Sequence, residues 1–343
     1  MWRLESSGRE RRSEEPGALR VLWVLAEDVH FGPGSDLLTT EALLKAFAGH
    51  PAVTQSLTTL RRLGMGADGV YVICRPFEPG DLSGARVAFD GASRARVDGF
   101  DVVFVRVDPP VTEPFRHALM LLGHVEEQGR VLFINSPRAI CARGSKLLNL
   151  RFRDLLAPSL VTGALQEGLS FLRTQGAARW VAKPLDRASG TDVIRFSPDE
   201  GEQVLRRLLD VYGFIQLQEY LPEVERTGEL RCLVFGGELV AAWRKVPAAG
   251  DFRANLDHGA TVHPVEPAAA ERLARPLMER LASLEPGFRF YSADFIGERL
   301  NELNVENVGG LSSADRLYGR DHAALILKRL LALASGAPRT ASV

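Results

Sequence analysis

The 343-residue sequence has little cysteine, almost no net charge and no long apolar run. Its three cysteines, Cys74, Cys141 and Cys232, are far apart and match neither a disulfide framework nor zinc-ligand spacing. Lysine and arginine total 42 against 43 aspartate and glutamate, so the net charge of -1 gives no broad attraction for nucleic acid or acidic lipid. No apolar run approaches the roughly 20 residues that span a bilayer, and the first residues are charged, unlike a signal peptide. These absences predict a cytoplasmic protein without a nucleic-acid or membrane partner.

Composition and length predict a folded chain of two or three lobes. Hydrophobic residues make up 45% and charged residues 25%, which is the balance of an ordinary globular protein. Residues 1–17, rich in arginine, glutamate and serine, are expected to form a disordered leader, and residues 335–343 a frayed tail. The pattern of strands and helices changes between these ends. We therefore place one domain at 18–135 and a second region at 136–334.

The first of these parts has the pattern of an α/β domain with a parallel sheet. Polar groups gather where its apolar runs stop, as Arg106 and Asp108 do, and the carboxyl ends of strands are where such domains bind ligands. Buried strands are expected at 21–25, 102–105 and 131–134, and helices at 37–48 and 115–128.

The second part has the pattern of antiparallel strands with helices outside them. One hairpin is expected around Gly236-Gly237, a dipeptide suited to the positive φ angles of a tight turn, and another around residues 297–299. The expected strands are 180–183, 193–196, 214–220, 230–235, 239–246, 290–296 and 300–305, and the expected helices are 202–211, 268–284 and 322–334.

The last hairpin carries Asp294 on one strand and Glu302 and Asn304 on the other. Residues two apart share a sheet face, and a three-residue loop would place Asp294 directly opposite Glu302. Two carboxylates held face to face repel each other without a cation, and Mg²⁺ favours one or two carboxylates supplemented by phosphate and water. The hairpin therefore predicts a phosphate-bound magnesium site. The alternative is an exposed hairpin whose polar face meets solvent.

Two lysines are candidates for phosphate binding. Lys183 ends an apolar strand and precedes a loop of small and polar residues that includes Ser189 and Gly190, whose backbone N–H groups could form a concavity for an anion. Lys146 lies in a basic stretch after the first domain and could reach the same phosphates from the opposite side. The alternatives are a surface turn for the loop and a solvated helix lysine for Lys146.

A further strand ends in the segment Gln218, Glu219, Tyr220 and Leu221. Its backbone amides could contact an adenine edge while Glu219 meets polar atoms of the nucleotide. The alternative is a set of buried strand residues.

The order of these pieces resembles bacterial glutathione synthetase within the ATP-grasp superfamily. The resemblance covers most of the chain and implies an N-terminal parallel-sheet pre-ATP-grasp domain followed by a two-lobed ATP-grasp region. The segments that carry it are RVDPP (106–110), INSP (134–137), VAKPLD (181–186), LQEYLP (217–222), FRANLDHGA (252–260) and DFIGERLNELNV (294–305).

The resemblance implies roles for individual residues. Lys146 and Lys183 become phosphate ligands, and Arg253 stabilises the transferring γ-phosphoryl group, with Asn255 beside it on a loop over the active site. The remaining implied roles are Glu219 to Leu221 as the adenine hinge, Glu229 as a ribose contact, Asp294, Glu302 and Asn304 as Mg²⁺ ligands, and Arg106 and Asp108 as residues facing the carboxylate substrate.

Three departures from the family pattern are visible. The phosphate loop is poor in glycine, and the hinge has Gln-Glu-Tyr where familiar members have Gln-Asn-Tyr. Where the family often continues with Thr-Ser-Pro, this chain has Glu306-Asn307-Val308-Gly309-Gly310, a segment that resembles part of the family's acceptor pocket. The amine acceptor therefore stays open.

The resemblance implies an ATP-dependent ligase that joins a small-molecule carboxylate to an amine. The carboxylate attacks the γ-phosphorus to give an acylphosphate and ADP, and the amine then displaces phosphate to form an amide. The implied cofactors are ATP and Mg²⁺, with two ions and with Mn²⁺ as a substitute, and the implied assembly is a homo-oligomer, a dimer or tetramer. A glutamyl dipeptide such as γ-glutamylcysteine is the first choice of donor. A specialised ligase with another acceptor and a non-catalytic nucleotide-binding regulator remain alternatives.

Overall fold

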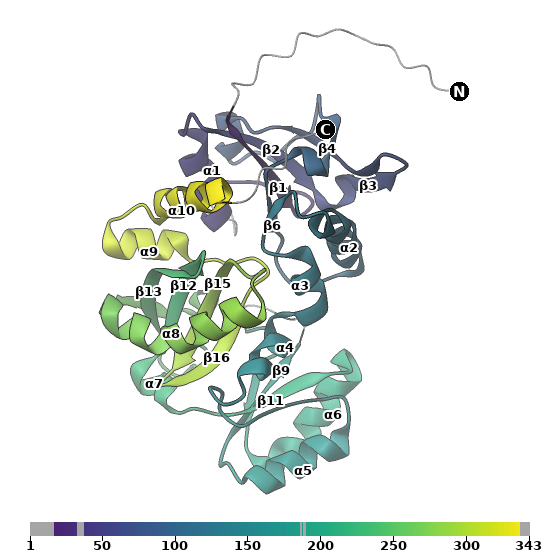
Figure 1. Cartoon of the computed structure of the whole chain (residues 1–343). Helices are drawn as coiled ribbons and strands as arrows, with labels where there is room; N and C mark the ends of the chain where they lie inside the picture. The colour runs from purple at the N-terminus through teal and green to yellow at the C-terminus, as the bar shows by residue number, and fades with distance from the viewer. Residues whose placement is uncertain (1–16, 33–37, 186, 188–189, 337–343) are drawn as a thin grey trace.

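The computed structural model describes residues 17–32, 38–185, 187 and 190–336. The predicted leader, apart from Gly17, and most of the predicted tail lie outside the described residues, as does Ser189. Figure 1 shows an N-terminal sheet at one end of the molecule, a small lobe with helices α5 and α6 at the other, and a third sheet between them. Among the described residues no helix is long and apolar enough to cross a membrane.

The N-terminal sheet has the strand order β3-β4-β2-β1-β6-β7, with β5 paired to β4. Its centre is parallel, because β1 pairs in parallel with β2 and β6, and β6 with β7. This confirms the predicted parallel sheet, but the antiparallel extension formed by β3, β4 and β5 was not predicted. The strands are β1 (Leu19–Leu25), β2 (Val53–Thr59), β3 (Leu63–Gly66), β4 (Gly69–Pro76), β5 (Ser93–Arg96), β6 (Val102–Arg106) and β7 (Leu132–Ile134), and the helices are α1 (Leu38–Ala48) and α2 (Glu113–Glu127).

Two short helices lead from this sheet into the second region. The Ser136 side chain caps the start of the first helix by accepting a hydrogen bond from the Ala139 N–H. Gly144, with a φ of 57°, ends the first helix and precedes the second. They are α3 (Pro137–Arg143) and α4 (Ser145–Asn149), and the predicted boundary at 135/136 falls between β7 and α3.

The small lobe is an antiparallel sheet of order β10-β9-β11-β8 covered by two helices. Strand β8 and helix α5 were not predicted. The elements are β8 (Ser159–Thr162), α5 (Leu165–Gln175), β9 (Trp180–Pro184), β10 (Ile194–Phe196), α6 (Gly201–Tyr212) and β11 (Ile215–Glu219).

The third sheet is antiparallel, with the order β14-β13-β12-β15-β16. The predicted turn at Gly236-Gly237 is confirmed, since both glycines have positive φ angles, 63° and 82°. The elements are α7 (Glu223–Thr227), β12 (Glu229–Phe235), β13 (Glu238–Val246), β14 (Thr261–Pro264), α8 (Pro267–Leu284), β15 (Phe290–Ile296), β16 (Arg299–Asn304), α9 (Leu311–Tyr318) and α10 (His322–Gly336). Helix α9 was not predicted.

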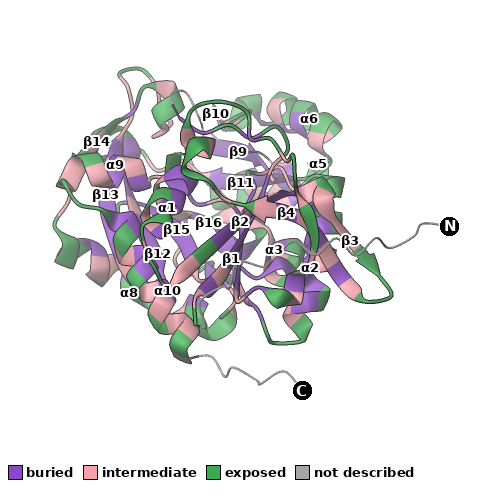
Figure 2. Ribbon diagram, turned by 90° about the horizontal axis from the view of Figure 1, so that it is seen from above, coloured by how far each residue is buried: buried purple, intermediate pink, exposed green. Residues whose placement is uncertain are grey.

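Two of the three parts of the molecule share a hydrophobic core, and the third has its own. Two hydrophobic clusters each contain residues of both the N-terminal sheet and the five-stranded sheet, so these two parts share their interior. The lobe has a cluster of its own, built around Trp180, Leu205 and Leu217. Figure 2 shows the buried strands inside and helices that expose one side to solvent.

Asn135 ties the N-terminal sheet to the five-stranded sheet. Its side chain is buried and its amide nitrogen donates to the carbonyls of Phe290 and Val305, at 2.5 and 2.7 Å. Its oxygen accepts from the N–H groups of Arg289 and Phe290, at 2.8 and 2.7 Å. One asparagine therefore satisfies four backbone groups of the neighbouring domain.

Candidate active site

A cavity of about 950 Å³ lies where the three parts of the molecule meet. The N-terminal domain contributes Asp108, Pro109 and Pro110, the lobe contributes β9 and the end of β11, and the five-stranded sheet contributes the floor. All the predicted site residues that the structure describes line this cavity except Arg106.

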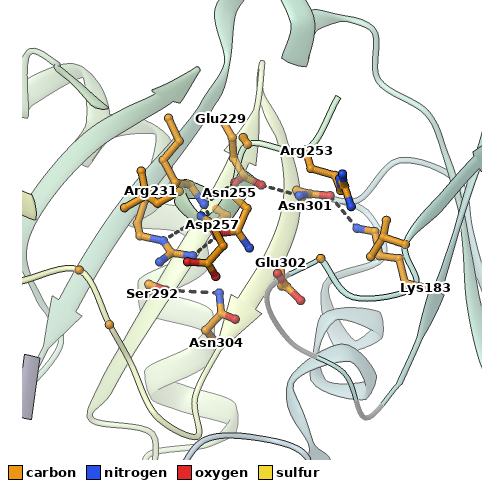
Figure 3. A pocket seen from close by; sticks show the side chains of 18 of the residues that line it. Lys183, Glu229, Arg231, Arg253, Asn255, Asp257, Ser292, Asn301, Glu302 and Asn304 are labelled. Atoms are coloured by element: carbon orange, nitrogen blue, oxygen red, sulfur yellow. Dashed lines mark hydrogen bonds and ion pairs between the residues drawn. The ribbon is translucent and has the colours of Figure 1, made fainter. Parts of the chain in front are cut away.

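The floor follows from strand alternation and register. Arg231 on β12 pairs with Trp243 on β13 and with Asp294 on β15, and Asp294 pairs in turn with Glu302 on β16. Because side chains two apart share a face, Glu229 lies beside Arg231 on the same face. The opposite face of this sheet packs against α8. One face thus presents a row of charged groups to the cavity (Figure 3).

The predicted opposition of Asp294 and Glu302 is confirmed, but the route to it differs. The turn has two residues, Gly297 and Glu298, because Ile296 pairs with Arg299. A bulge then inserts Asn301 between the pairs Phe295–Leu300 and Asp294–Glu302. The extra residue restores the register that a longer turn was expected to give.

Asp294 is neutralised by cations of the protein itself. Arg231 donates to both of its oxygens, with Nε–Oδ1 at 2.8 Å and Nη2–Oδ2 at 2.7 Å, and Lys245 Nζ lies 3.2 Å from Oδ2. Burial acts to raise the pKa of Asp294, but Arg231 and Lys245 outweigh it and lower the pKa to about 2. The carboxylate is therefore ionised, and the repulsion expected between it and Glu302 is relieved by these two side chains.

The residues on this floor fit a divalent metal ion. Glu302 is part-exposed towards the cavity, and the Asn304 amide nitrogen donates to Ser292 Oγ at 3.4 Å, which leaves its oxygen for a ligand. Two carboxylates and an amide oxygen are the hard donors that Mg²⁺ prefers. Within the described ranges no group of three or more His, Cys, Asp or Glu surrounds a metal position. An ion here needs further oxygen ligands, such as phosphate and water.

The two predicted phosphate lysines face this floor and both are buried. Lys183 Nζ donates to Gln218 Oε1 at 2.8 Å and to Asn301 Oδ1 at 3.0 Å, and burial lowers its pKa. Lys146 Nζ donates to the Arg187 carbonyl at 2.6 Å and lies 3.7 Å from Glu302 Oε1. The structure thus brings both ammonium groups to the cavity.

Glu229, the predicted ribose contact, is held on both oxygens. Lys245 Nζ lies 2.5 Å from Oε2, and Asn301 Nδ2 donates to Oε1 at 2.5 Å. Burial raises the pKa of Glu229, opposed by Lys245. Glu229 borders the cavity as a paired group and not as a free carboxylate.

The predicted hinge residues Gln218 to Leu221 line the cavity, but two of the amides expected to meet adenine are engaged. The Glu219 N–H donates to the Pro158 carbonyl at 2.9 Å, and the Tyr220 N–H donates to the Arg179 carbonyl at 3.1 Å. Both bonds tie the end of β11 to neighbouring segments of the lobe. This leaves Leu221 as the hinge amide for an adenine edge.

The loop between β13 and β14 covers the cavity and carries Arg253 and Asn255. Asp251 accepts from Arg253 Nε at 3.0 Å and from Nη2 at 2.8 Å, and these hydrogen bonds lower the pKa of Asp251. Asn255 caps a short turn by accepting from the Asp257 N–H. Gly190 of the lobe approaches so closely that a Cβ there would lie 3.3 Å from Arg253 Cδ. The two loops therefore meet over the cavity.

Arg106, predicted to face the carboxylate substrate, does not line the cavity. It is 3% exposed, and its guanidinium donates to Thr40 Oγ1 at 3.0 Å and to the Val308 carbonyl at 2.9 Å. Burial lowers the pKa of Arg106 to about 10. Arg106 is the last residue of the fully buried strand β6. Its hydrogen bond to Val308 connects the segment after β16 to the N-terminal domain.

The other end of the cavity is formed by Asp108 and the segment Glu306 to Gly310. Asn307 Nδ2 donates to Asp108 Oδ1 at 2.8 Å, which joins the two domains across this end. Gly310 has a φ of 110°, and a Cβ there would lie 2.5 Å from the ring of Trp243. Its N–H donates to Thr39 Oγ1 at 3.0 Å. This end of the cavity, predicted from the sequence to be the acceptor end, is therefore tightly packed around Gly310.

Four residues of the site were missed from the sequence: Arg231, Lys245, Asp251 and Asn301. Two signals were available. Arg231 shares a strand face with Glu229, and Lys245 lies on the neighbouring strand of the same hairpin, so the pattern places their charges in one cluster. Leu300 and Leu303 are both apolar although they are three apart, which breaks strand alternation and indicates a bulge.

Comparisons with known proteins agree along most of the chain. Residues 145–319 match the family model of the prokaryotic glutathione synthetase ATP-grasp domain, and residues 35–141 match the model of its N-terminal domain. A glutathione synthetase of Parasynechococcus marenigrum is 34% identical over 323 residues, which cover 92% of this chain and 100% of that protein. One from Agrobacterium fabrum is 29% identical over 278 residues, covering 78% and 83%.

Solved structures show the same fold at low identity. A D-cycloserine synthetase superposes with a TM-score of 0.64 at 18% identity, covering 92% of this chain and 99% of its own. The D-alanyl-alanine synthetase A of Vibrio cholerae gives 0.58 at 13% identity, covering 93% and 99%. These likenesses confirm the predicted ATP-grasp fold.

Proposed function

The chain belongs to the prokaryotic glutathione synthetase family and is an ATP-dependent carboxylate–amine ligase, and we propose that it forms its amide through an acylphosphate in the cavity described above. Enzymes of this family act on small-molecule substrates, and the family implies use of ATP with a divalent metal ion. This membership favours the ligase over a non-catalytic nucleotide-binding regulator. What remains to be assigned is which residue does what.

One observation carries the proposal. Two buried ammonium groups, Lys146 and Lys183, face the paired carboxylates Asp294 and Glu302, and the Lys146–Glu302 separation is 3.7 Å. Buried charges are costly unless they are paired or bind a charged ligand. A triphosphate with its magnesium would satisfy both sides at once, because phosphate oxygens meet the lysines and the cation meets the carboxylates.

The protein's own groups act by position and charge. Lys146 and Lys183 neutralise phosphate oxygens, and Arg253 stabilises the charge that develops on the transferring γ-phosphoryl group, with Asn255 shaping the loop that presents it. Asp294, Glu302 and Asn304 hold magnesium, which when bound supplies further charge stabilisation on the phosphates. The hinge, above all Leu221, contacts adenine, and Glu229 lies near the ribose. No covalent nucleophile of the protein is required.

The order of bond changes follows from this arrangement. A carboxylate oxygen of the substrate attacks the γ-phosphorus, and the bond to the bridging oxygen of ADP breaks. The amine then attacks the acyl carbon, phosphate leaves with the bonding electron pair, and the amine loses a proton. The loops carrying Gly190 and Arg253 meet over the cavity and would limit the access of water to the acylphosphate.

The finer assignments complete the proposal. We place two magnesium ions in the cavity, replaceable by Mn²⁺, and assign the protein to the cytoplasm as a homo-oligomer, a dimer or tetramer. The near-zero net charge supports the absence of nucleic-acid and membrane partners.

The first substrate pair to test is γ-glutamylcysteine with glycine. Wild type should release ADP and form a product with the mass of the tripeptide, and Glu302→Gln should do neither. Glu298→Gln, in the exposed turn of the same hairpin, serves as the matched control and should keep wild-type turnover. Normal ADP release by Glu302→Gln would overturn the metal assignment.

A specialised ligase with another acceptor is the second candidate, and the acceptor end of the cavity favours keeping it. Asn307 and Asp108 join across this end, and Glu306 lies next to them at the cavity wall. Glu306 and Asn307 stand where the family pattern often has Thr-Ser-Pro. A panel of amino acids tested with γ-glutamylcysteine and with other dipeptide donors, read by ADP release and product mass, separates the candidates. No ADP release with glycine, together with ADP release and product formation with another amine, would establish the specialised ligase.

A further inference from the structure

The bulge in β16 places two consecutive side chains on the cavity face. Leu300 and Leu303 are both fully buried on the opposite face, so the strand changes its alternation between them. Asn301 is the inserted residue, and it lines the cavity together with Glu302. Figure 3 shows Asn301 between Lys183 and Glu229.

Asn301 bridges a cation and an anion with opposite ends of one amide. Its oxygen accepts from Lys183 Nζ at 3.0 Å, and its nitrogen donates to Glu229 Oε1 at 2.5 Å. An amide can do this in one orientation only, because the oxygen must face the ammonium and the nitrogen must face the carboxylate. The two contacts therefore fix the side chain and, through it, the position of the ammonium group.

The same bridge places a neutral oxygen rather than a carboxylate against the ammonium, and Glu302 attracts that ammonium from further away. The two side-chain groups that accept from Lys183 are the amide oxygens of Gln218 and Asn301, which are neutral. The nearby carboxylate of Glu229 is paired with Lys245 at 2.5 Å. Hydrogen bonds to neutral oxygens hold a lysine in place without cancelling its attraction for phosphate.

We propose that Asn301 is a positioning residue that holds the Lys183 ammonium towards the nucleotide phosphates and keeps Glu229 from pairing with it. The inference rests on the proposed role of Lys183 as a phosphate ligand. The bridge has two consequences: removing the amide weakens phosphate binding through Lys183, and replacing it by a carboxylate weakens binding further by supplying a counter-charge.

The test measures ATP binding by calorimetry with magnesium present and without carboxylate or amine substrates. Asn301→Leu, which keeps the volume and removes both contacts, should weaken ATP binding roughly ten- to a hundredfold, as expected for loss of hydrogen bonds to charged groups. Asn301→Asp should weaken it at least as much. Adenosine, which has no phosphate, should bind wild type and Asn301→Leu equally in competition with ATP, whereas a general disturbance of the cleft would weaken both.

A double-mutant cycle separates an action through Lys183 from an independent one. In a Lys183→Met background, Asn301→Leu should change ATP affinity by less than about twofold. Equal losses in both backgrounds, or wild-type ATP binding by Asn301→Leu, would overturn the proposal. Unchanged ATP binding by Lys183→Met alone would overturn the phosphate role of Lys183 and this inference with it.

Folding controls keep the cycle interpretable. Glu298→Gln, in the turn of the same hairpin, should bind ATP like wild type. Thermal melting is measured for every variant, and Asn301→Ser replaces Asn301→Leu if the latter does not fold. Asn301→Ser also loses the bridge to Glu229, so it should show the same loss of ATP affinity and the same dependence on Lys183.

Discussion

The small lobe and the rest of the molecule are built in opposite ways. The N-terminal domain and the five-stranded sheet share two hydrophobic clusters, and Asn135 adds four hydrogen bonds between them. The lobe has a separate cluster whose buried members all lie between residues 172 and 217. A shared interior resists relative motion, whereas a separate one permits it.

The residues that line the cavity come from both of these structural units. We call the N-terminal domain and the five-stranded sheet together the fused part. It contains the charged floor, with Asp294 and Glu302, and the proposed acceptor end, with Asp108 and Asn307. Lys183, Gly190 and the hinge belong to the lobe. In the proposed function, the metal and acceptor positions would therefore be preformed, and the nucleotide would be enclosed by a unit that folds around its own core.

The largest expected effect comes from the floor of the fused part. Glu302→Gln keeps the shape of the side chain and removes the charge that magnesium requires, so kcat for ADP release should fall at least about a hundredfold. Steady-state ADP release measures this. ATP binding in the absence of metal should change little, since the lysines and hinge remain.

The matched comparison is with Glu238→Gln, which removes an exposed carboxylate on another strand of the same sheet. Its turnover should equal that of wild type. A comparable loss in both variants would show that the effect is not specific to the cavity.

The second-largest effect is expected at Asn135, which joins the N-terminal domain to the five-stranded sheet. Asn135→Ala removes four hydrogen bonds between the two domains, so the free energy of unfolding should fall by about 4 kcal/mol or more. Urea unfolding followed by tryptophan fluorescence and circular dichroism measures it. The two signals should also separate, because the domains lose their coupling.

Gln128→Ala, at the exposed end of α2, is the control and should change the unfolding free energy by less than about 0.5 kcal/mol. An unfolding curve for Asn135→Ala that matches this control would show that the shared clusters alone hold the parts together.

The lobe offers the converse test. Leu205 is fully buried in the lobe cluster, and Leu205→Ala should destabilise it by about 3 kcal/mol through the cavity it leaves. Hydrogen exchange followed by mass spectrometry should show faster exchange in α5, α6 and the lobe strands, with β12 and β15 unchanged. Faster exchange throughout the molecule would contradict the independence of the lobe.

The smallest effect is a count of reactive thiols. Cys141 is exposed, whereas Cys74 and Cys232 are buried, and burial raises the pKa of Cys232 to about 12. A thiol reagent at pH 8 should modify one cysteine rapidly in the native protein and three after unfolding. All three lie outside the lobe, so Leu205→Ala should keep the count at one. A second fast thiol in that variant would show that lobe unfolding spreads into the fused part.

The sequence predicted the parts of this architecture that depend on local periodicity. Continuous apolar runs identified the parallel strands β1, β6 and β7 but not β2, and Gly236-Gly237 identified a hairpin whose turn needs positive φ angles. The opposition of Asp294 and Glu302 was also predicted, although two deviations cancel to produce it: a shorter turn and a bulge. Strand parity is informative even when the turn is assigned wrongly.

The parts that were not predicted depend on contacts between distant segments. Arg106 looked like a substrate ligand because it follows a strand, but Thr40 and Val308, 66 and 202 residues away, accept its hydrogen bonds. The hinge amides of Glu219 and Tyr220 are engaged by Pro158 and Arg179. Periodicity and motif order do not contain such pairings, because they arise only once the domains have packed.

Gly310 limits how the end of the cavity formed by Asp108 and Asn307 can change over evolution. The left-handed backbone, together with a Trp243 ring only 2.5 Å from where a Cβ would lie, excludes any side chain at this position. Substitutions that reshape this end of the cavity must therefore fall on neighbours such as Glu306 and Asn307. Their divergence from the family pattern lies where the backbone still tolerates variation.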